Sequence, residues 1–144
     1  MVRNWNIIRE VLEACEQDRL EKFIEKSGAD YDEDNLTPQE IAHLDLENAK
    51  KYRKLVLGHL ELCIDEGFIK GIELVNYTDG SLGPVSFCND ARLTMKGHDF
   101  LVRLRDDNTW NKIKSFSKHT GIVLTVESIA EIAACLVKKT VNRE

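Results

Sequence analysis

The apolar positions near the amino terminus predict a helix that starts after Asn4, a residue well suited to an N-cap. Its buried face consists of residues at i, i+3, i+4, i+7 and i+8 spacing: Ile7, Ile8, Val11, Leu12 and Cys15. The same spacing resumes through Leu20, Phe23 and Ile24, before a polar, acidic loop over residues 27–36.

Two further helices are predicted before residue 68. The segment Thr37–Glu40 has a cap, a proline at the first helical position and a glutamate at the third, which indicates a short helix. A longer helix follows from a cap at Asp45 or Asn48 and ends at Gly67. Its inner face consists of Ala49, Tyr52, Val56, Leu60 and Cys63.

The hydrophobic period then changes from helical to extended. Residues 68–77 are rich in β-formers, and a second half-buried run extends from Val85 to Leu93. The intervening segment Thr78–Pro84 has the composition of a turn, so the two runs are expected to pair as a hairpin. A hairpin directly after a helix-turn-helix has the outline of a wing.

Three helical patterns occupy the rest of the chain. Thr94 caps the first, and a second capping signal at Asp106–Asn108 precedes Trp110, so two consecutive helices or one kinked helix fit equally well. After a break at residues 119–121, Thr125 caps a last helix. Its predicted inner residues are Ile129, Ile132, Ala133, Leu136 and Val137.

This order of elements predicts a mostly helical α/β fold in a single domain over residues 1–144. Residues 1–93 form a winged helix-turn-helix core with a β-hairpin wing, and residues 94–144 form a helical extension. A length of 144 residues with 42% apolar residues is enough for one core.

Three local strings carry a family resemblance. They are Trp5–Arg9 (WNIIR), His59–Ile69 (HLELCIDEGFI) and Leu93–Leu101 (LTMKGHDFL), the last continuing through RDD at 105–107 to WNKIK at 110–114. Together they resemble a family of uncharacterised bacterial and prophage proteins described as winged-helix-like. The resemblance implies that fold and a bacterial or phage origin. The chain departs from the family pattern at Gly58, where an aromatic is usual, and in a longer segment before His59.

Composition narrows the cellular setting and the chemistry. The four cysteines, Cys15, Cys63, Cys88 and Cys135, form no CxxC pair, which favours a reduced, cytoplasmic protein. No run approaches the ~20 apolar residues that a membrane-spanning helix needs. The net charge is −5, which argues against indiscriminate binding of nucleic acid.

The charge is unevenly distributed, and one basic cluster stands out. Residues 1–49 hold five basic and thirteen acidic residues, and the cluster Lys50, Lys51, Arg53 and Lys54 follows immediately. It lies in the first turns of the helix expected to enter the major groove, where Arg53 would contact guanine and the lysines phosphate. The alternative is that these residues only solubilise the outer face of an amphipathic helix.

Other features bear on a partner. Lys112, Lys114 and Lys118 would supply further phosphate contacts if they share a face with the cluster. The predicted wing has no Lys or Arg, and Tyr77, Leu82 and Pro84 either pack the hairpin, which is favoured, or contact a protein. The last helix carries Ala130, Ala133 and Ala134, which suit either a homodimer or packing within the domain equally well.

Candidate chemistry is weak. His59 and Cys63 have a spacing that can bind a metal, but both lie on the predicted inner face, which favours a core role. His98 with Asp99, Asp106 and Asp107 is better explained by a helix cap and by a packing point at Gly97 than by catalysis. We therefore expect no enzyme, metal or cofactor.

The leading hypothesis is a winged-helix protein that binds double-stranded DNA, as a small transcriptional regulator. The alternative is a winged-helix adaptor that binds another protein and no DNA. An acidic surface and an uncharged wing are compatible with this second hypothesis.

Overall fold

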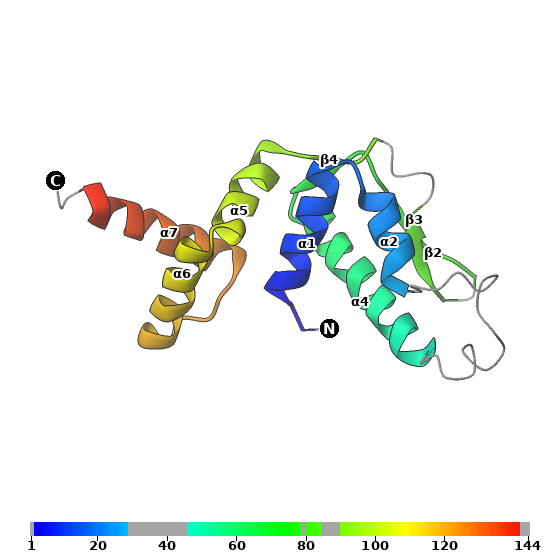
Figure 1. The fold of residues 1–144 in the computed structure, drawn as a ribbon, viewed down its shortest axis with the longest axis horizontal. Coiled ribbons are helices and arrows are strands. Elements are labelled where there is room, and N and C mark those ends of the chain that lie inside the picture. Colours follow the sequence, from blue (N-terminus) through cyan, green and yellow to red (C-terminus); the bar gives the residue numbers. More distant parts are fainter. Residues whose placement is uncertain (1, 29–45, 79, 85–89, 142–144) are drawn as a thin grey trace. The chain divides into compact units, whose positions relative to one another are not determined.

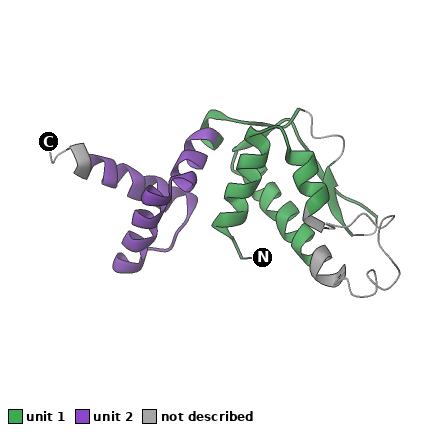
Figure 2. Ribbon diagram, in the orientation of Figure 1, with its two compact units in different colours: residues 1–97 green, residues 98–144 purple. Residues whose placement is uncertain are grey.

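The computed structural model describes residues 2–28, 46–78, 80–84 and 90–141 (Figure 1). Within these ranges lie six helices and four short strands, so the chain is a mostly helical α/β protein. The chain divides into two compact units, residues 1–97 and 98–144 (Figure 2), and the boundary falls inside helix α5 (Met95–Arg105). None of the described helices is long and apolar enough to cross a membrane.

Helix α1 (Trp5–Glu16) begins where the sequence predicts. The Asn4 side-chain oxygen accepts hydrogen bonds from the backbone N–H groups of Asn6 at 3.0 Å and Ile7 at 3.3 Å, as an N-cap does. The predicted apolar stripe is buried. A tight turn with Asp18 in the left-handed region (φ 56°) separates α1 from α2 (Leu20–Gly28).

Helix α4 (Leu46–Asp65) packs against α1 and α2 and contributes much of the core of the first unit. Its predicted inner residues Val56, Leu60 and Cys63 are buried. The predicted end is confirmed as well. Gly67 has a φ of 76°, and the Phe68 N–H donates to the Cys63 carbonyl at 2.9 Å, in the manner of a Schellman motif.

Two predictions in this region have other outcomes. The short helix expected after Thr37 lies outside the described residues. Tyr52 is predicted on the inner face of α4. It lies beside Glu10 of α1, but 41% of it is exposed.

The four strands form one interrupted hairpin. Strand β1 (Ile69–Lys70) pairs antiparallel with β4 (Arg92–Leu93), and β2 (Leu74–Asn76) pairs antiparallel with β3 (Leu82–Pro84). Ile69 and Leu93 lie opposite each other and are buried. Between the two ladders the returning side of the hairpin has four more residues than the outgoing side, since five positions separate Ile69 from Leu74 and nine separate Pro84 from Leu93.

The hairpin is confirmed, but its turn is shorter than predicted. The sequence predicts a turn through Pro84, whereas residues 82–84 form β3. Backbone hydrogen bonds from Tyr77 N–H to Ser81 at 2.8 Å and from Gly80 N–H to Tyr77 at 2.9 Å already close the loop. Pro84 is tolerated because each strand of a two-stranded sheet is an edge strand, where a missing N–H costs little.

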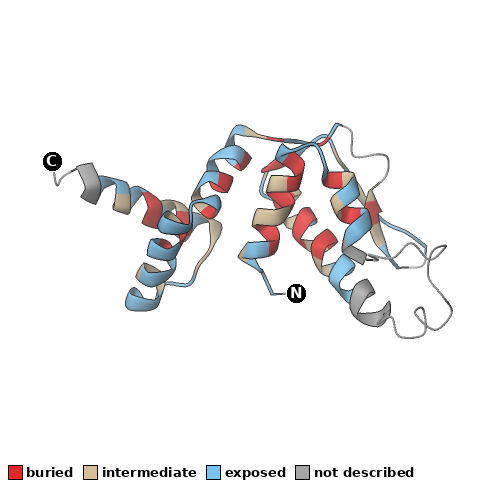
Figure 3. Ribbon diagram, in the orientation of Figure 1, coloured by how far each residue is buried: buried red, intermediate tan, exposed pale blue. Residues whose placement is uncertain are grey.

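The second unit contains most of α5, helix α6 (Asp107–Thr120) and helix α7 (Val126–Val141). Asp106 separates α5 from α6 by accepting hydrogen bonds from the N–H groups of Asn108 and Thr109, so the structure has two helices here instead of one kinked helix. Gly121 ends α6 with a φ of 76°. All three helices have buried positions (Figure 3). The buried residues are Phe100, Leu101, Leu104, Trp110, Ile113, Ile129, Ile132 and Ala133.

Helix α7 starts as predicted but does not turn all of its predicted residues inward. The Ser128 N–H donates to the Thr125 hydroxyl at 3.0 Å, and the Thr125 N–H donates to the Ser128 hydroxyl at 2.7 Å, a reciprocal cap. Val137 was predicted to face inward, but 62% of it is exposed. At about 100° per residue, Val137 lies roughly 80° around the helix from Ile129, at the margin of the buried face.

Candidate nucleic-acid interface

The predicted basic cluster lies on the early turns of α4. Lys51, Arg53 and Lys54 are exposed, whereas the side chain of Lys50 lies outside the described residues. Lys51 and Lys54 stand three residues apart, so they project from the same side of the helix. Within the described part of the chain, none of these three cations takes part in a salt bridge.

Tyr52 lies among these cations but faces helix α1. Burial raises the pKa of Tyr52 above its ordinary value of 10.0. The negative charge of the Glu10 carboxylate on α1 and a hydrogen bond to it raise this pKa further. At about 100° per residue, Lys54 then projects from nearly the opposite side of α4. The contact with α1 therefore leaves the other sides of these turns free to carry the cations.

The outer face of α4 changes sign along its length. Glu61 and Asp65 are exposed, and they follow Lys54 by seven and eleven residues, which places them on the same face of the helix. The beginning of that face is positive and its end is negative. A polyanion would therefore be attracted to the beginning of α4 and repelled from its end.

The hairpin beside α4 has no cation at its tip. Strand β3 packs against α4, and Figure 1 shows β2 and β3 extending toward the same end of the first unit as the start of α4. Its exposed side chains include Val75 and Tyr77. Residues 71–78 and 80–84 contain neither Lys nor Arg.

Tyr77 closes the hairpin. Its hydroxyl donates a hydrogen bond to the Pro84 carbonyl at 2.6 Å, and a Cβ at Gly83 would lie 2.8 Å from the Tyr77 ring, so the ring lies directly over that glycine. The favoured interpretation of Tyr77 as a packing residue is confirmed, although 47% of it stays exposed.

A second pair of cations lies at the base of the hairpin and was missed by sequence reasoning. Lys70 and Arg92 are directly opposite each other in the β1–β4 ladder, and both are exposed. Arg92 also donates to the Asp90 carbonyl at 3.4 Å. Each cation is next to a buried residue, Ile69 or Leu93, and this alternation indicates that both cations face solvent. The alternation alone does not show that the two cations are paired, because that depends on the strand register.

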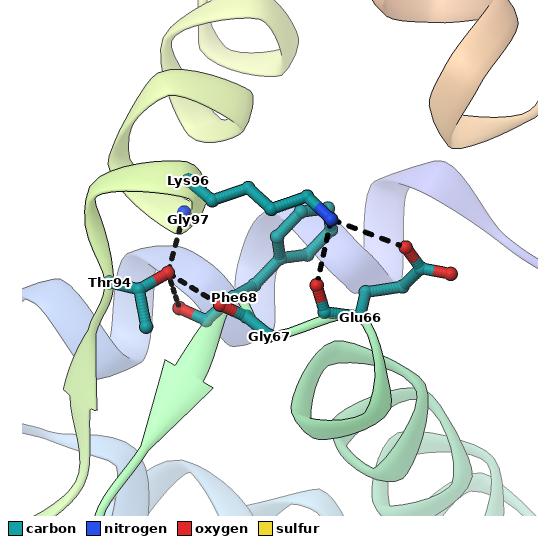
Figure 4. A network of polar contacts seen from close by, with 6 residues as sticks. All are labelled: Glu66, Gly67, Phe68, Thr94, Lys96 and Gly97. Atoms are coloured by element: carbon teal, nitrogen blue, oxygen red, sulfur yellow. Dashed lines mark hydrogen bonds and ion pairs between the residues drawn. The ribbon is translucent and has the colours of Figure 1, made fainter.

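Lys96 has a structural role at the junction of α4, β1 and α5 (Figure 4). Its ammonium group donates to the Glu66 carbonyl at 3.0 Å, lies 3.8 Å from the Glu66 carboxylate and lies 5.4 Å from the centre of the Phe68 ring. These three contacts occupy the cation within the protein.

Thr94 and Gly97 complete this junction. The Thr94 hydroxyl accepts from the Gly97 N–H at 3.0 Å and lies 2.5 Å from the Gly67 carbonyl, to which it donates. A Cβ on Gly97 would collide with the Phe68 carbonyl oxygen, so the predicted packing point at Gly97 is confirmed. The end of α4 and the start of α5 are held together by backbone contact.

The three cations predicted as secondary contacts lie on α6. Lys112, Lys114 and Lys118 are all exposed, and Lys114 lies 5.9 Å from the centre of the Trp110 ring. They belong to the second unit, whereas the cations of α4 belong to the first. Lys118 also lies in the last turn of α6, where a cation is favourable beside the helix carboxyl end.

His59 is a buried hydrogen-bonding residue. Its Nε2 accepts from the Asn4 N–H at 2.8 Å, and its Nδ1 lies 2.7 Å from the Leu55 carbonyl, which can only accept. Both bonds form together only in the neutral ring with the proton on Nδ1. The ring therefore joins the start of α1 to the middle of α4, and the core interpretation of His59 is confirmed.

The cysteines are placed mostly as the composition suggests. Cys15 and Cys63 are buried, Cys135 is half-buried, and Cys88 lies outside the described residues. Burial, with smaller contributions from Cys15 and Glu66, raises the pKa of Cys63 to about 12. The thiol of Cys63 thus stays neutral, whereas a thiol that binds metal or attacks a substrate must ionise.

Acidic residues near α6 also serve the fold. Hydrogen bonds from the Thr109 hydroxyl and backbone N–H hold the pKa of Asp106 below its ordinary value of 3.8, which identifies this carboxylate as a helix cap. Over the residues that the structure describes, no three His, Cys, Asp or Glu side chains gather in a group that could hold a metal ion.

Comparison with known proteins gives the chain a family. A family model described as "Hypothetical protein (DUF2513)" matches residues 2–123. The chain belongs to this family. The DUF2513 match spans α1 to α6 and includes the cations of both α4 and α6, and it ends before α7. Membership in a family of uncharacterised proteins was predicted from the local strings, and it is confirmed.

A relative extends the likeness over nearly the whole chain. An uncharacterised protein of Haemophilus influenzae is 28% identical over 140 residues, which cover 96% of this DUF2513 chain and 98% of the relative. No solved structure matches the chain.

Proposed function

We propose that residues 1–97 form a winged-helix module that binds double-stranded DNA, with α4 as the recognition helix. Among the described residues, α1 and α2 precede α4 and a hairpin follows it, an order compatible with a winged helix-turn-helix. In this proposal α4 enters the major groove by its amino-terminal turns, and the β2–β3 hairpin is the wing beside it.

The observation that carries the proposal is the position of Lys51, Arg53 and Lys54. They are exposed on the turns that would lie in the groove, on the sides of α4 that the Tyr52 contact with α1 leaves open. Arg53 would donate two hydrogen bonds to a guanine edge, and the lysines would contact flanking phosphates.

The remaining charges favour a local, specific mode of binding over general coating of DNA. The chain has a net charge of −5, and acidic residues occupy the far end of the same face of α4. Only the first turns of α4 then approach the duplex closely. Such a protein fits a small transcriptional regulator, for which Lys112, Lys114 and Lys118 on α6 offer additional phosphate contacts.

The second candidate function is a winged-helix adaptor that binds another protein. The observation in its favour is the hairpin tip, which carries no cation among its described residues and exposes Val75 and Tyr77. A wing that binds DNA usually offers a phosphate contact, whereas an exposed apolar and aromatic tip suits a protein surface.

Salt-dependent DNA binding tests the proposal. Fluorescence anisotropy with a pool of labelled duplex fragments would compare the wild-type chain with a Lys51→Ala/Lys54→Ala double variant at several salt concentrations. We expect the variant to bind at least about tenfold more weakly at low salt. Its slope of log affinity against log salt should fall by about 1.8, because each lost phosphate contact removes about 0.9.

Lys22→Ala/Lys26→Ala is the matched control. These two exposed lysines lie on α2, and their removal changes the net charge by the same amount. The control should bind DNA almost as wild type does, since a local interface does not depend on total charge. Equal losses in both variants, or no binding by the wild-type chain at low salt, would overturn the proposal and direct the search to protein partners.

A further inference from the structure

Helix α7 carries more apolar surface than its own unit covers. Ten of its sixteen residues are apolar, but among its described side chains only Ile129, Ile132 and Ala133 are buried. These three form the face that packs within the second unit, where α7 contacts α6. A helix that is apolar on more than one side is normally covered on more than one side.

The uncovered apolar residues form a second stripe. Ala130, Ala134 and Val137 recur at i, i+4 and i+7, next to the buried face. Ala134 is exposed, Ala130 is half-buried, and Val137 is 62% exposed. This stripe is narrow and made of small or β-branched residues, so another helix could approach it closely.

Charged residues lie along one edge of this stripe in a definite order. Glu127 and Glu131 are exposed in the first half of α7, and Lys138 is exposed in the second half. The three differ by four and seven residues, so they share one side of the helix. The edge is therefore acidic toward the start of α7 and basic toward its end.

We infer that α7 pairs with the α7 of a second copy of this chain, antiparallel across a two-fold axis that passes near Ala134. In an antiparallel pair, residues on the same edge of the stripe meet across the interface. Glu127 and Glu131 of each copy then lie near Lys138 of the other, and the two helix dipoles also oppose each other favourably.

The order of charges selects this arrangement over its alternatives. In a parallel pair of α7 helices, the charged edges of the two copies would lie on opposite sides of the interface, so the glutamates of one copy would not meet the lysine of the other. The charge order of α7 is complementary to that of a second α7 in the opposite direction. A partner of unrelated sequence would not explain this self-complementarity. A second copy of the chain accounts for the apolar stripe and the charge order together, and it does so without reference to DNA binding.

Charge reversal and mixing test the inference. Sedimentation analysis across a range of chain concentrations should show a dimer for the wild-type chain. Glu127→Lys/Glu131→Lys and Lys138→Glu should each weaken self-association by about tenfold or more, because every attractive pair becomes repulsive. An equimolar mixture of the two variants should dimerise again, since each copy then presents the charge that the other needs.

The mixture separates loss of the interface from loss of the fold, because an unfolded chain would not regain a partner. Asp99→Lys on α5 and Lys22→Glu on α2 are control reversals at exposed positions outside α7, and they should leave the dimer intact. A monomeric wild-type chain, a dimer insensitive to both reversals, or a mixture that stays monomeric would each overturn the inference. None of these results affects the DNA-binding test, which depends on α4.

Discussion

Within the two units of this protein, the hydrogen bonds span different distances along the sequence. In the first unit, Asn4 and His59 form a hydrogen bond across 55 positions of sequence, and Thr94 and Gly67 form one across 27. In the second, the hydrogen bonds that cap α6 and α7 join residues no more than five apart. The first unit thus depends on distant segments meeting, whereas each helix of the second is bounded by its own neighbours.

The difference can be measured because each unit contains one tryptophan. Trp5 lies at the start of α1 and Trp110 is buried in α6, and the chain has no other. Trp5→Phe and Trp110→Phe variants would each leave a single fluorescent reporter, so that unfolding of the two units can be followed separately.

The largest expected effect is from Leu60→Ala in the core of the first unit. Leu60 is fully buried, and its truncation should lower the free energy of unfolding by about 2–5 kcal/mol. Urea titration should show a large shift in the transition reported by Trp5 and a smaller one in that reported by Trp110. Equal shifts would mean that the two units unfold as one cooperative body, and the comparison above would fail.

A smaller effect distinguishes two glycines that are needed for different reasons. Gly97→Ala should cost about 1–3 kcal/mol, because its Cβ would collide with the Phe68 backbone. Gly121→Ala should cost about 1 kcal/mol, because its surroundings are open and only its positive φ is unfavourable for alanine. Gly121→Asn should recover part of this loss, whereas Gly97→Asn should not. Thermal unfolding of the four variants would check this order.

The smallest expected effect is a pH dependence at the start of α6. Because the folded-state pKa of Asp106 is lowered, its contribution to stability is present above the ordinary value of 3.8 and is lost as pH falls through the folded value. Asp106→Asn keeps a capping oxygen but cannot titrate. The stability advantage of wild type over this variant, followed through Trp110, should shrink below pH 4. A constant difference across that range would contradict the assignment.

Most of the helix boundaries could be predicted because they depend on single residues with local effects. Asn4, Asp106 and Thr125 cap helices by bonding to N–H groups two or three residues away, and Gly67 and Gly121 end helices through their own positive φ. The hairpin turn was harder to predict from the sequence. Its closing bonds around Tyr77 involve the backbone, and turn-like residues at 82–84 pair as a strand all the same.

The candidate site was predictable in position but not in its surroundings. The cations of α4 stand out in the sequence, and the helix that bears them followed from its apolar spacing. That Tyr52 faces Glu10, that Lys70 lies opposite Arg92, and that Lys96 is engaged by Glu66 all depend on the tertiary fold. Such pairings join residues that no local pattern relates, so they required the structure.

The hydrogen bond between Asn4 and His59 also has a consequence for biosynthesis. The start of α1 leaves the ribosome early, but the ring nitrogen that accepts its N–H is made 55 positions later. Helix α1 therefore cannot reach its native environment until α4 has emerged, and the closing contacts at Thr94 and Gly97 come later still. The first unit should fold on the ribosome in one late step instead of helix by helix, with its apolar stripe exposed to chaperones meanwhile.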